Sequence, residues 1–385
     1  MNRPLKILLF GGSFDPPHLG HLALLRAALR RARPDRAYVL PAWQSPLKVP
    51  SGTPARTRLG LLDRALAEGL SPAERRAVVV DRFELQRGRR TYSYEAVRRL
   101  RRLHPGTEIL FLAGSDFLDD FARWRRPEEL LRSCRFLVGA RPGSSAPAEA
   151  ALLGFERLPG DFPEISSTEV RRRLLCGEDL SELLSPGVRR ALRAQGLYGT
   201  AVHRLLAARL EPKRYRHTLA VARIACELAA RHGLAVERAA LAGLLHDCGR
   251  ILSPSAMTRY ARAHRLEVPF FDEVVARRPG LLHAYVGADL GAKRFGVQDP
   301  AVLSAVRKHT LGDPRMTRFD RLLYTADACS EDRSYPEAVR IRRLARRDLD
   351  DGFRETVRVK LTWVLTQGDW MHPYGPALWN QACAG

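Results

Sequence analysis

Residues 11–21 read Gly-Gly-Ser-Phe-Asp-Pro-Pro-His-Leu-Gly-His and follow an apolar run, Ile-Leu-Leu-Phe, at residues 7–10. The apolar run predicts a short buried strand, and the glycines and prolines predict a turn that leads into a helix. Glycines let the backbone come close to a ligand, and the amide groups that open a helix attract anions. His18 and His21 are three residues apart and share one face of that helix. The stretch therefore predicts a cradle for a polyphosphate.

This eleven-residue string resembles the signature of the nucleotidylyltransferase superfamily. The resemblance implies that its glycines, the two residues after them and both histidines bind ATP: Gly11, Gly12, Ser13, Phe14, His18 and His21. The alternative interpretation is an ordinary turn beside two structural histidines. The string is not a P-loop, because no Gly-Lys-Ser/Thr follows it, and it lacks the spaced glycines of a dinucleotide fingerprint.

Three later stretches resemble one member of that superfamily, the bacterial nicotinate-nucleotide adenylyltransferases. Residues 110–124 look like its strand, Gly-x-Asp turn and downstream Trp, and residues 137–143 look like its next strand and Arg-Pro-Gly loop. Residues 165–171, Ile-Ser-Ser-Thr-Glu-Val-Arg, look like its second nucleotide motif. Hydroxyl residues before a glutamate also predict a helix N-cap. The resemblance covers residues 5–198.

The resemblance implies an enzyme of NAD biosynthesis that transfers AMP from ATP to nicotinate mononucleotide. The products are deamido-NAD and pyrophosphate, and Mg²⁺ is the expected cofactor. His18, His21, Lys48 and Arg171 are the expected catalytic residues of this half. Ser166, Ser167, Thr168 and Arg171 are expected to complete the ATP site, and the expected mononucleotide site consists of Ser93, Gly114, Asp116, Trp124 and Arg141.

Two positions near the expected nicotinate pocket depart from this family. The family usually has a Pro-Pro-His-Lys stretch, which here reads Ser-Pro-Leu-Lys, so that Leu47 replaces the histidine while Lys48 is kept. An aromatic residue usually follows the tryptophan, but Arg125 follows Trp124 here. Nicotinamide mononucleotide therefore stays open as the alternative substrate.

The second half of the sequence carries a different set of chemistry-bearing residues. His246 and Asp247 are adjacent in an apolar stretch that predicts a helix, and such a helix rarely buries an unpaired carboxylate. His217 precedes this pair, and His283, His309 and Asp327 follow it. Imidazole and carboxylate groups suit divalent transition metals. Two metals close together can activate water and bind a phosphate, with Asp247 as the bridging, catalytic carboxylate.

This His, His-Asp and late Asp pattern resembles the HD metallohydrolases, in particular the bacterial symmetrical diadenosine-tetraphosphate hydrolases. The resemblance rests on residues 281–288, 308–312 and 326–333. It implies six metal ligands, His217, His246, Asp247, His283, His309 and Asp327, that hold two divalent ions, with iron favoured. It also implies that Arg250 and Arg333 bind phosphate and that the substrate is a dinucleoside polyphosphate. Ser330 stands where this family usually has an acidic residue.

Composition limits the other function classes. The net charge is +22, with 64 Lys and Arg against 42 Asp and Glu, which is a charge that can steer polyphosphates. We do not expect nucleic-acid binding, because the arginines are spread along helices without interleaved aromatic residues. No apolar run is long enough to span a membrane, and six scattered cysteines suit a reducing cytoplasm. The oligomeric state is open.

Strand-like runs alternate with helical stretches over the first half, which predicts βαβ units and a parallel sheet. The expected fold is an α/β Rossmann-like parallel sheet of the nucleotidylyltransferase type in residues 1–199, followed by an all-α HD domain in residues 200–385. Three functional hypotheses remain. The chain is a bifunctional enzyme, an adenylyltransferase whose helical domain only senses a nucleotide, or a nucleic-acid-associated protein on a degenerate enzyme fold.

Overall fold

The computed structural model describes residues 4–45, 52–139 and 154–383. The chain forms two compact units. Residues 1–170 and 179–194 make up the first unit, and residues 171–178 and 195–385 make up the second. The short segment 171–178 therefore packs with the second unit, although it precedes the last part of the first. The domain boundary expected at residue 199 stays a prediction.

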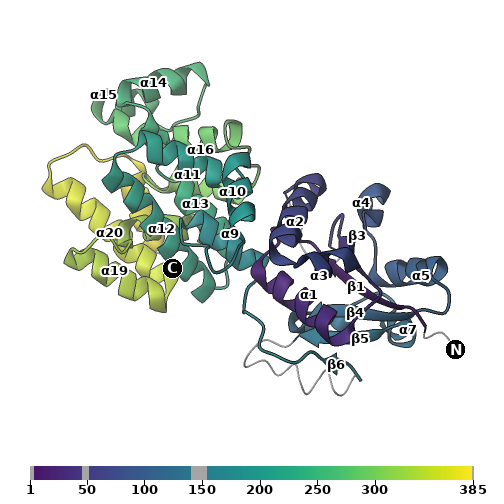
Figure 1. Ribbon diagram of the computed structural model, residues 1–385. Helices are drawn as coiled ribbons and strands as arrows, with labels where there is room; N and C mark the ends of the chain where they lie inside the picture. Colours follow the sequence, from purple (N-terminus) through teal and green to yellow (C-terminus); the bar gives the residue numbers. More distant parts are fainter. Residues whose placement is uncertain (1–3, 46–51, 140–153, 384–385) are drawn as a thin grey trace. The chain divides into compact units, whose positions relative to one another are not determined.

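The first unit is built on a six-stranded parallel sheet (Figure 1). Its strand order is β3-β2-β1-β4-β5-β6, so β1 lies in the interior of the sheet. Interior parallel strands are covered on both faces and are therefore apolar throughout, as the run Ile7–Phe10 is. The strands are β1 (Lys6–Gly12), β2 (Arg36–Pro41), β3 (Val78–Val80), β4 (Glu108–Gly114), β5 (Arg135–Gly139) and β6 (Glu156–Arg157).

Helices connect these strands and bury their apolar sides against the sheet. Ile7 and Leu9 of β1 share a core cluster with Val97 and Leu100, which lie on the helix before β4. The helices of this unit are α1 (Leu19–Ala32), α2 (Ala55–Gly69), α3 (Pro72–Ala77), α4 (Phe83–Arg87), α5 (Ser93–Leu103), α6 (Leu118–Phe121), α7 (Pro127–Ser133) and α10 (Pro186–Gln195), with the 3₁₀ helix η1 (Ser115–Phe117).

The strand order places the predicted nucleotide motifs at one edge of the sheet. Strand β1 has β2, the next strand in the sequence, as its neighbour on one side and β4 as its neighbour on the other side. Ligands of open α/β sheets bind at such a switch point, outside the carboxyl ends of the strands. Phe10 pairs with Leu112 in register, so the Gly11–His21 stretch and the turn after Gly114 leave the sheet at the same edge.

The second unit consists of helices alone among its described residues. The long amphipathic helix α12 carries His217, and α13 ends directly before His246. The helices are α11 (Thr200–Arg209), α12 (Pro212–Arg231), α13 (Val236–Leu245), α14 (Pro254–Ala263), α15 (Phe271–Arg277), α16 (His283–Lys293), α17 (Pro300–Lys308), α18 (Arg318–Cys329), α19 (Pro336–Arg347), α20 (Leu349–Thr366) and α21 (Tyr374–Cys383), with 3₁₀ helices η2 (Cys248–Ile251) and η3 (Pro279–Leu282). Helix α9 (Ser167–Leu175) begins in the first unit and ends in the second.

The predicted fold class is confirmed: a parallel α/β sheet precedes an all-helical region. The two-residue strand β6 was not expected, because Glu156 and Arg157 are too few to give an apolar pattern. Within the described residues, no helix combines the length and the apolar character that crossing a bilayer requires.

Candidate functional site

The first candidate site begins at the carboxyl end of β1. His18 is the N-cap residue of α1, and its ring centroid lies 3.6 Å from that of His21, one turn further on. The backbone N–H of His18 donates to Nδ1 of His21 across 3.2 Å. Because Nδ1 of His21 accepts this bond, the proton of the neutral ring is carried by Nε2. Nε2 of His21 is therefore an N–H donor, the kind of group that can bind a phosphate oxygen.

Two glycines of the string are required by close approaches around these rings. A Cβ at residue 20 would lie 3.0 Å from Nδ1 of His18, and a Cβ at residue 12 would lie 3.0 Å from the ring of Phe14. Phe14 is buried with a positive φ of 48° and packs edge-on against His21 at 5.0 Å between centroids. Gly12 and Gly20 thus make room for the packing that orients both histidines.

The second predicted nucleotide motif joins the first by a hydrogen bond. The Ser167 hydroxyl donates to the carbonyl oxygen of Pro16 across 2.9 Å, although 151 residues separate the two. Ser166 caps α9, because its Oγ accepts from the backbone N–H of Glu169 at 3.1 Å. Thr168 is exposed on the first turn of the same helix. The stretches predicted to contact ATP are therefore neighbours in the fold.

Arg58 of α2 is a structural part of this site that the sequence analysis missed. Its side chain is 2% exposed and donates to four backbone carbonyls. Ser13 supplies one of these carbonyls, and the loop after β2 supplies the others through Ala42, Trp43 and Thr53. A buried guanidinium with its hydrogen bonds satisfied holds these four carbonyls in place. An arginine inside an amphipathic helix gave no sequence signal of this role.

The residues predicted to bind the mononucleotide lie near the ends of β4 and α5. Ser93 is the first residue of α5, Gly114 ends β4, and Asp116 belongs to η1. Trp124 packs edge-on against Phe111 of β4 at 5.8 Å and stays partly exposed. The guanidinium of Arg125 lies 4.6 Å from the ring centroid of Tyr92. Two further predicted residues, Lys48 and Arg141, lie outside the described residues.

Arg171, predicted to bind ATP phosphate, forms an ion pair in the structure. Its Nη2 lies 2.6 Å from Oε1 of Glu237 and its Nε lies 3.2 Å from Oε2, so the pair is bidentate. Both residues belong to the second unit. The role of Arg171 toward a nucleotide stays a prediction.

The second candidate site brings five of the six predicted metal ligands, the four histidines and Asp247, into two overlapping groups. One group is His217, His246 and Asp247, and the other is Asp247, His283 and His309. Within each group the possible ligand atoms all lie within 4.8 Å of one another. Asp247 belongs to both groups, which is the arrangement that a carboxylate bridging two ions requires.

The backbone orients three of the four histidines in the same way. The Nδ1 atoms of His246, His283 and His309 each lie 2.7 Å from the carbonyl oxygen three residues earlier. Because a carbonyl only accepts, Nδ1 carries the proton, and each Nε2 lone pair points into the site. Nε2 of His246 is buried and has no hydrogen-bond partner among the described residues. This atom fits a metal ion that would accept its lone pair.

The carboxylate of Asp247 lies between two arginines. Nη1 of Arg214 donates to Oδ2 at 2.7 Å, and Nε of Arg250 donates to Oδ1 at 2.6 Å. Burial alone would raise the pKa of Asp247, but the surrounding histidines and Arg250 hold it well below its usual range. Asp247 is therefore a carboxylate, the form that binds a cation.

Asp327 of α18 lies beside the first group. Its Oδ1 is 3.1 Å from Nε2 of His217 and accepts a hydrogen bond from Arg333 at 2.9 Å. Lys360 of α20 lies 3.8 Å from its Oδ2. Burial lowers the pKa of Lys360 to about 8, and Arg333 adds to this shift while Asp327 opposes it. Four cations thus surround two carboxylates. Lys360 and Arg333 lie beside Asp327, and Arg214 and Arg250 lie beside Asp247.

The sequence analysis missed Arg214 and Lys360. Arg214 lies three residues before His217, on the same helix, and could have been suspected from that spacing. Lys360 lies far along the chain in an ordinary amphipathic helix, so that only the packing of α20 against α18 brings it to the site.

Comparison with known protein families identifies two regions of this chain. Residues 9–173 match the Cytidylyltransferase-like family, and residues 214–332 match the HD domain family. The first match contains both predicted nucleotide motifs, and the second contains all six predicted metal ligands.

Relatives match either half or nearly all of the chain. A protein of Exiguobacterium sibiricum named probable nicotinate-nucleotide adenylyltransferase is 33% identical over 200 residues, which are 51% of this chain and 100% of the relative. A Mycoplasma genitalium protein named probable nicotinate-nucleotide adenylyltransferase/Ap4A hydrolase is 26% identical over 85% of this chain and 88% of the relative. A Clostridium acetobutylicum crystal structure, described as a predicted HD superfamily hydrolase involved in NAD metabolism, is 28% identical over 48% of this chain and 96% of its own, with a TM-score of 0.46.

Proposed function

Because the chain belongs to the nicotinate-nucleotide adenylyltransferase family and carries an HD domain, we propose that it is a bifunctional enzyme. The first half transfers AMP from ATP to nicotinate mononucleotide in NAD biosynthesis. The second half hydrolyses a dinucleoside polyphosphate, with diadenosine tetraphosphate giving two molecules of ADP.

The bond between Ser167 and Pro16 is the observation that supports the first activity most directly. It holds the hydroxyl-bearing start of α9 against the turn that precedes His18 and His21. A nucleotide at the switch point would meet the histidine rings on one side and the N-terminus of α9 on the other. Both groups favour negative charge, which suits a triphosphate.

The proposed transfer is a direct displacement at phosphorus. A phosphate oxygen of the mononucleotide attacks the α-phosphorus of ATP, the new P–O bond forms, and the bond to the β-phosphate oxygen breaks. Pyrophosphate leaves with its electron pair, so no residue forms a covalent intermediate. His21 donates from Nε2 to a phosphate oxygen, and His18 holds the same chain of phosphates. Mg²⁺ on the phosphates would supply further charge neutralisation. Catalysis is then positioning together with charge stabilisation.

Arg125 supports the acid rather than the amide as the preferred mononucleotide. Its guanidinium lies over the ring of Tyr92. Arg125 also directly follows Trp124 in the sequence, which the family resemblance places in the mononucleotide site. A permanent cation at this position attracts the carboxylate of nicotinate and has no comparable partner on nicotinamide. The departure at residue 125 leaves the amide open as a family comparison, but the charge of Arg125 itself favours the acid.

The second activity rests on the buried Nε2 of His246 and on the charge around Asp247 and Asp327. Divalent ions bound here would supply Lewis acidity for phosphoryl chemistry. The chain itself supplies Arg214, Arg250 and Arg333, which face the site and can bind the several negative charges of a polyphosphate. Hydrolysis adds one water across a phosphoanhydride, breaks its bridging P–O bond and releases two protons with two ADP. The metal is expected to be iron.

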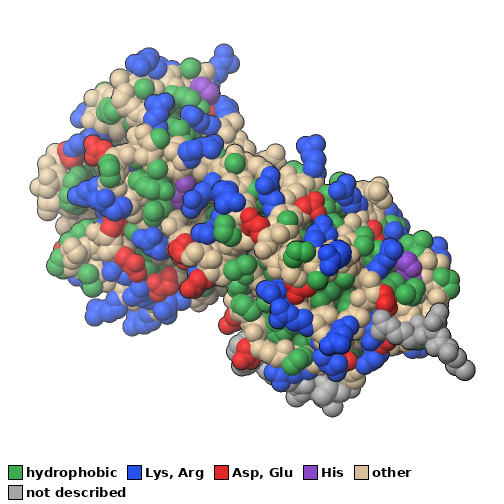
Figure 2. Space-filling model, in the orientation of Figure 1, with side chains coloured by type: hydrophobic (Ala, Val, Ile, Leu, Met, Phe, Trp, Pro, Cys, Tyr) green, Lys and Arg blue, Asp and Glu red, His purple; other side chains and the backbone are tan. Residues whose placement is uncertain are grey.

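Nucleic-acid binding is not supported by the distribution of charge. On the face drawn in Figure 2, Lys and Arg side chains alternate with acidic and apolar ones over the described surface. Many of the arginines are paired with Glu or Asp, as Arg98 is with Glu129 and Arg346 with Glu227. Such pairs reduce the positive potential that a phosphate backbone would require.

Two variants of the full-length chain test the proposal. His21→Ala should lose adenylyl transfer and keep hydrolysis of diadenosine tetraphosphate, whereas Asp247→Asn should lose hydrolysis and keep adenylyl transfer. Wild-type protein should also be loaded with Fe²⁺ or Mn²⁺ and assayed. If it hydrolyses neither diadenosine tetraphosphate nor other nucleotides, hydrolysis is refuted and the hypothesis of a nucleotide-sensing helical unit is favoured. A wild-type chain without adenylyl transfer to either mononucleotide would refute the first half.

A further inference from the structure

His217 differs from the other three histidines of the candidate metal centre in what holds its ring. The other three bond through Nδ1 to a backbone carbonyl. They lie at helix ends or turns, where such carbonyls are available. His217 lies inside α12, and its Nδ1 lies 2.9 Å from Oδ2 of Asp332. A side chain therefore orients this ring.

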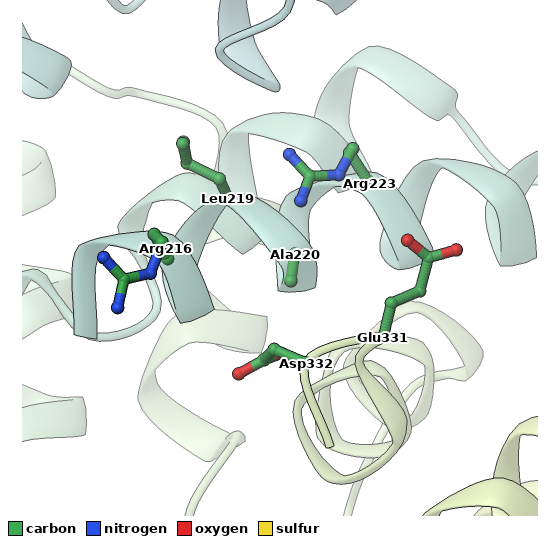
Figure 3. Close-up of a pocket in the computed structure, with 6 residues that line it drawn as sticks. All are labelled: Arg216, Leu219, Ala220, Arg223, Glu331 and Asp332. Carbon is green, nitrogen blue, oxygen red and sulfur yellow. The ribbon is translucent and has the colours of Figure 1, made fainter. Parts of the chain in front are cut away.

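Asp332 reaches His217 from the turn after α18. Its side chain is 37% exposed and lines a pocket of about 480 Å³ together with Arg216, Leu219, Ala220, Arg223 and Glu331 (Figure 3). Ser330, two residues earlier, is fully buried with its Oγ 3.4 Å from the same Nδ1. The Asp332 carboxylate is therefore the nearer of the two side chains that reach this nitrogen, at 2.9 Å against 3.4 Å.

The two nitrogens of His217 have opposite surroundings. Nδ1 faces the Asp332 carboxylate, while Nε2 faces Asp327, 3.1 Å away, on the side of the ligand group. A carboxylate that accepts the Nδ1 proton fixes the tautomer with a lone pair on Nε2 and makes that lone pair more basic. A carboxylate thus holds one nitrogen of His217, and the other nitrogen would be the one to bind a metal ion.

We propose that Asp332 is the positioning residue for His217 and sets the metal affinity of one of the two ion positions. The proposal rests on the proposed metal-dependent function of the second unit. His217 belongs to the group with His246 and Asp247 and is absent from the group with His283 and His309. Loss of Asp332 should therefore weaken one ion and leave the other in place.

The buried position of Ser330 suggests how this chain places its carboxylate. Residue 330 is close enough to Nδ1 for its hydroxyl to lie at 3.4 Å, yet a hydroxyl carries no charge. Asp332 provides the charged acceptor from two residues further along the turn. A carboxylate moved to residue 330 should therefore be able to replace the one at residue 332.

The test measures Mn²⁺ binding to the full-length chain by electron paramagnetic resonance, without any substrate. In Asp332→Ala, the affinity of one Mn²⁺ equivalent should fall by about 10–100-fold, while the other stays within about threefold of wild type. Glu331→Ala is the matched control. Glu331 lines the same pocket, and its replacement by alanine removes the same negative charge. It should leave both affinities unchanged. Asp332→Asn keeps the shape of the side chain without its charge. Its affinity for the weakened Mn²⁺ should lie between those of Asp332→Ala and Glu331→Ala.

Ser330→Asp introduced into the Asp332→Ala variant supplies the rescue, and it should restore the weakened affinity. Equal weakening of both ions, equal effects of Glu331→Ala and Asp332→Ala, or unchanged affinity in Asp332→Ala would each overturn the proposal. If the alanine variant loses its helical circular dichroism, the asparagine variant decides the outcome in the same titration. A chain that binds two Mn²⁺ as predicted but hydrolyses no dinucleoside polyphosphate would refute the proposed substrate and leave this inference standing.

Discussion

Arg214 donates to Oδ2 of Asp247 across 2.7 Å, although 33 residues separate them in the sequence. Asp247 is the residue shared by both candidate ligand groups, so this guanidinium lies beside the carboxylate common to both. An arginine at this position is close enough to contact a phosphate bound at the same site. We therefore expect Arg214 to bind substrate.

Replacement of Arg214 by alanine tests this role. Arg214→Ala should lower kcat/KM for diadenosine tetraphosphate by about 10²-fold, because a charge-assisted contact to the phosphates is lost. Arg216→Ala is the matched control: it removes the same charge from the same turn of α12, on the face that lines the pocket behind Asp332. It should change kcat/KM by less than about threefold. Equal losses in the two variants would mean that only the general positive charge matters.

Replacement of His21 tests the adenylyl site. His21→Ala should reduce adenylyl transfer by about 10²–10³-fold, because it removes a donor directed at a phosphate. His104 offers a matched histidine of the same unit, bonded to the hydroxyl of Tyr38 rather than placed at the predicted ATP site. His104→Ala should keep the rate of pyrophosphate release within about threefold of wild type. Near-normal turnover of His21→Ala would refute the assignment.

Arg125 should determine the preference between the two mononucleotides. In Arg125→Ala, kcat/KM for nicotinate mononucleotide should fall about tenfold, while the value for nicotinamide mononucleotide stays nearly constant. The measurement is the ratio of the two kcat/KM values with ATP in excess. Arg126→Ala, one residue further on, is the control. If wild type prefers the amide, the acid assignment is wrong whatever the variant does.

Glu84 of α4 should make stability depend on pH. Burial raises the pKa of this carboxyl to about 7 from 4.5, with a further upward contribution from Glu95, while a hydrogen bond from the Trp43 backbone opposes the shift. The folded state thus holds a proton that the unfolded chain releases above pH 4.5. This stabilisation is present below pH 4.5 and is lost as the pH rises through 7, by about 3 kcal/mol.

Glu84→Gln removes this dependence, because a neutral amide needs no proton. Between pH 5 and pH 8, the unfolding free energy of wild type should fall by that amount relative to the unfolding free energy of the variant. Urea unfolding of both proteins at several pH values measures it. A difference that stays constant over this range would contradict the raised pKa.

The sequence predicted the fold where local patterns carry the information. Apolar runs such as Ile7–Phe10 fill strands of the sheet, and the Ser166 cap lies where the hydroxyl run predicted it. Contacts between distant segments gave no such pattern. Arg58, Lys360 and Asp332 act through partners that the fold brings to them, and each looks like an ordinary charged surface residue in the sequence. The candidate metal ligands could be proposed from the sequence because an adjacent His-Asp pair in an apolar stretch is rare without a function.

The four carbonyls bound by Arg58 have a practical consequence for protein engineering. A graft of residues 11–21 onto another parallel sheet would transfer every side chain of the string, yet the carbonyl of Ser13 would lose the guanidinium that holds it. A successful graft needs an arginine in the recipient protein at the position that Arg58 occupies here. The segment to be transferred is therefore discontinuous, because Arg58 lies 37 positions after His21, the last histidine of the string.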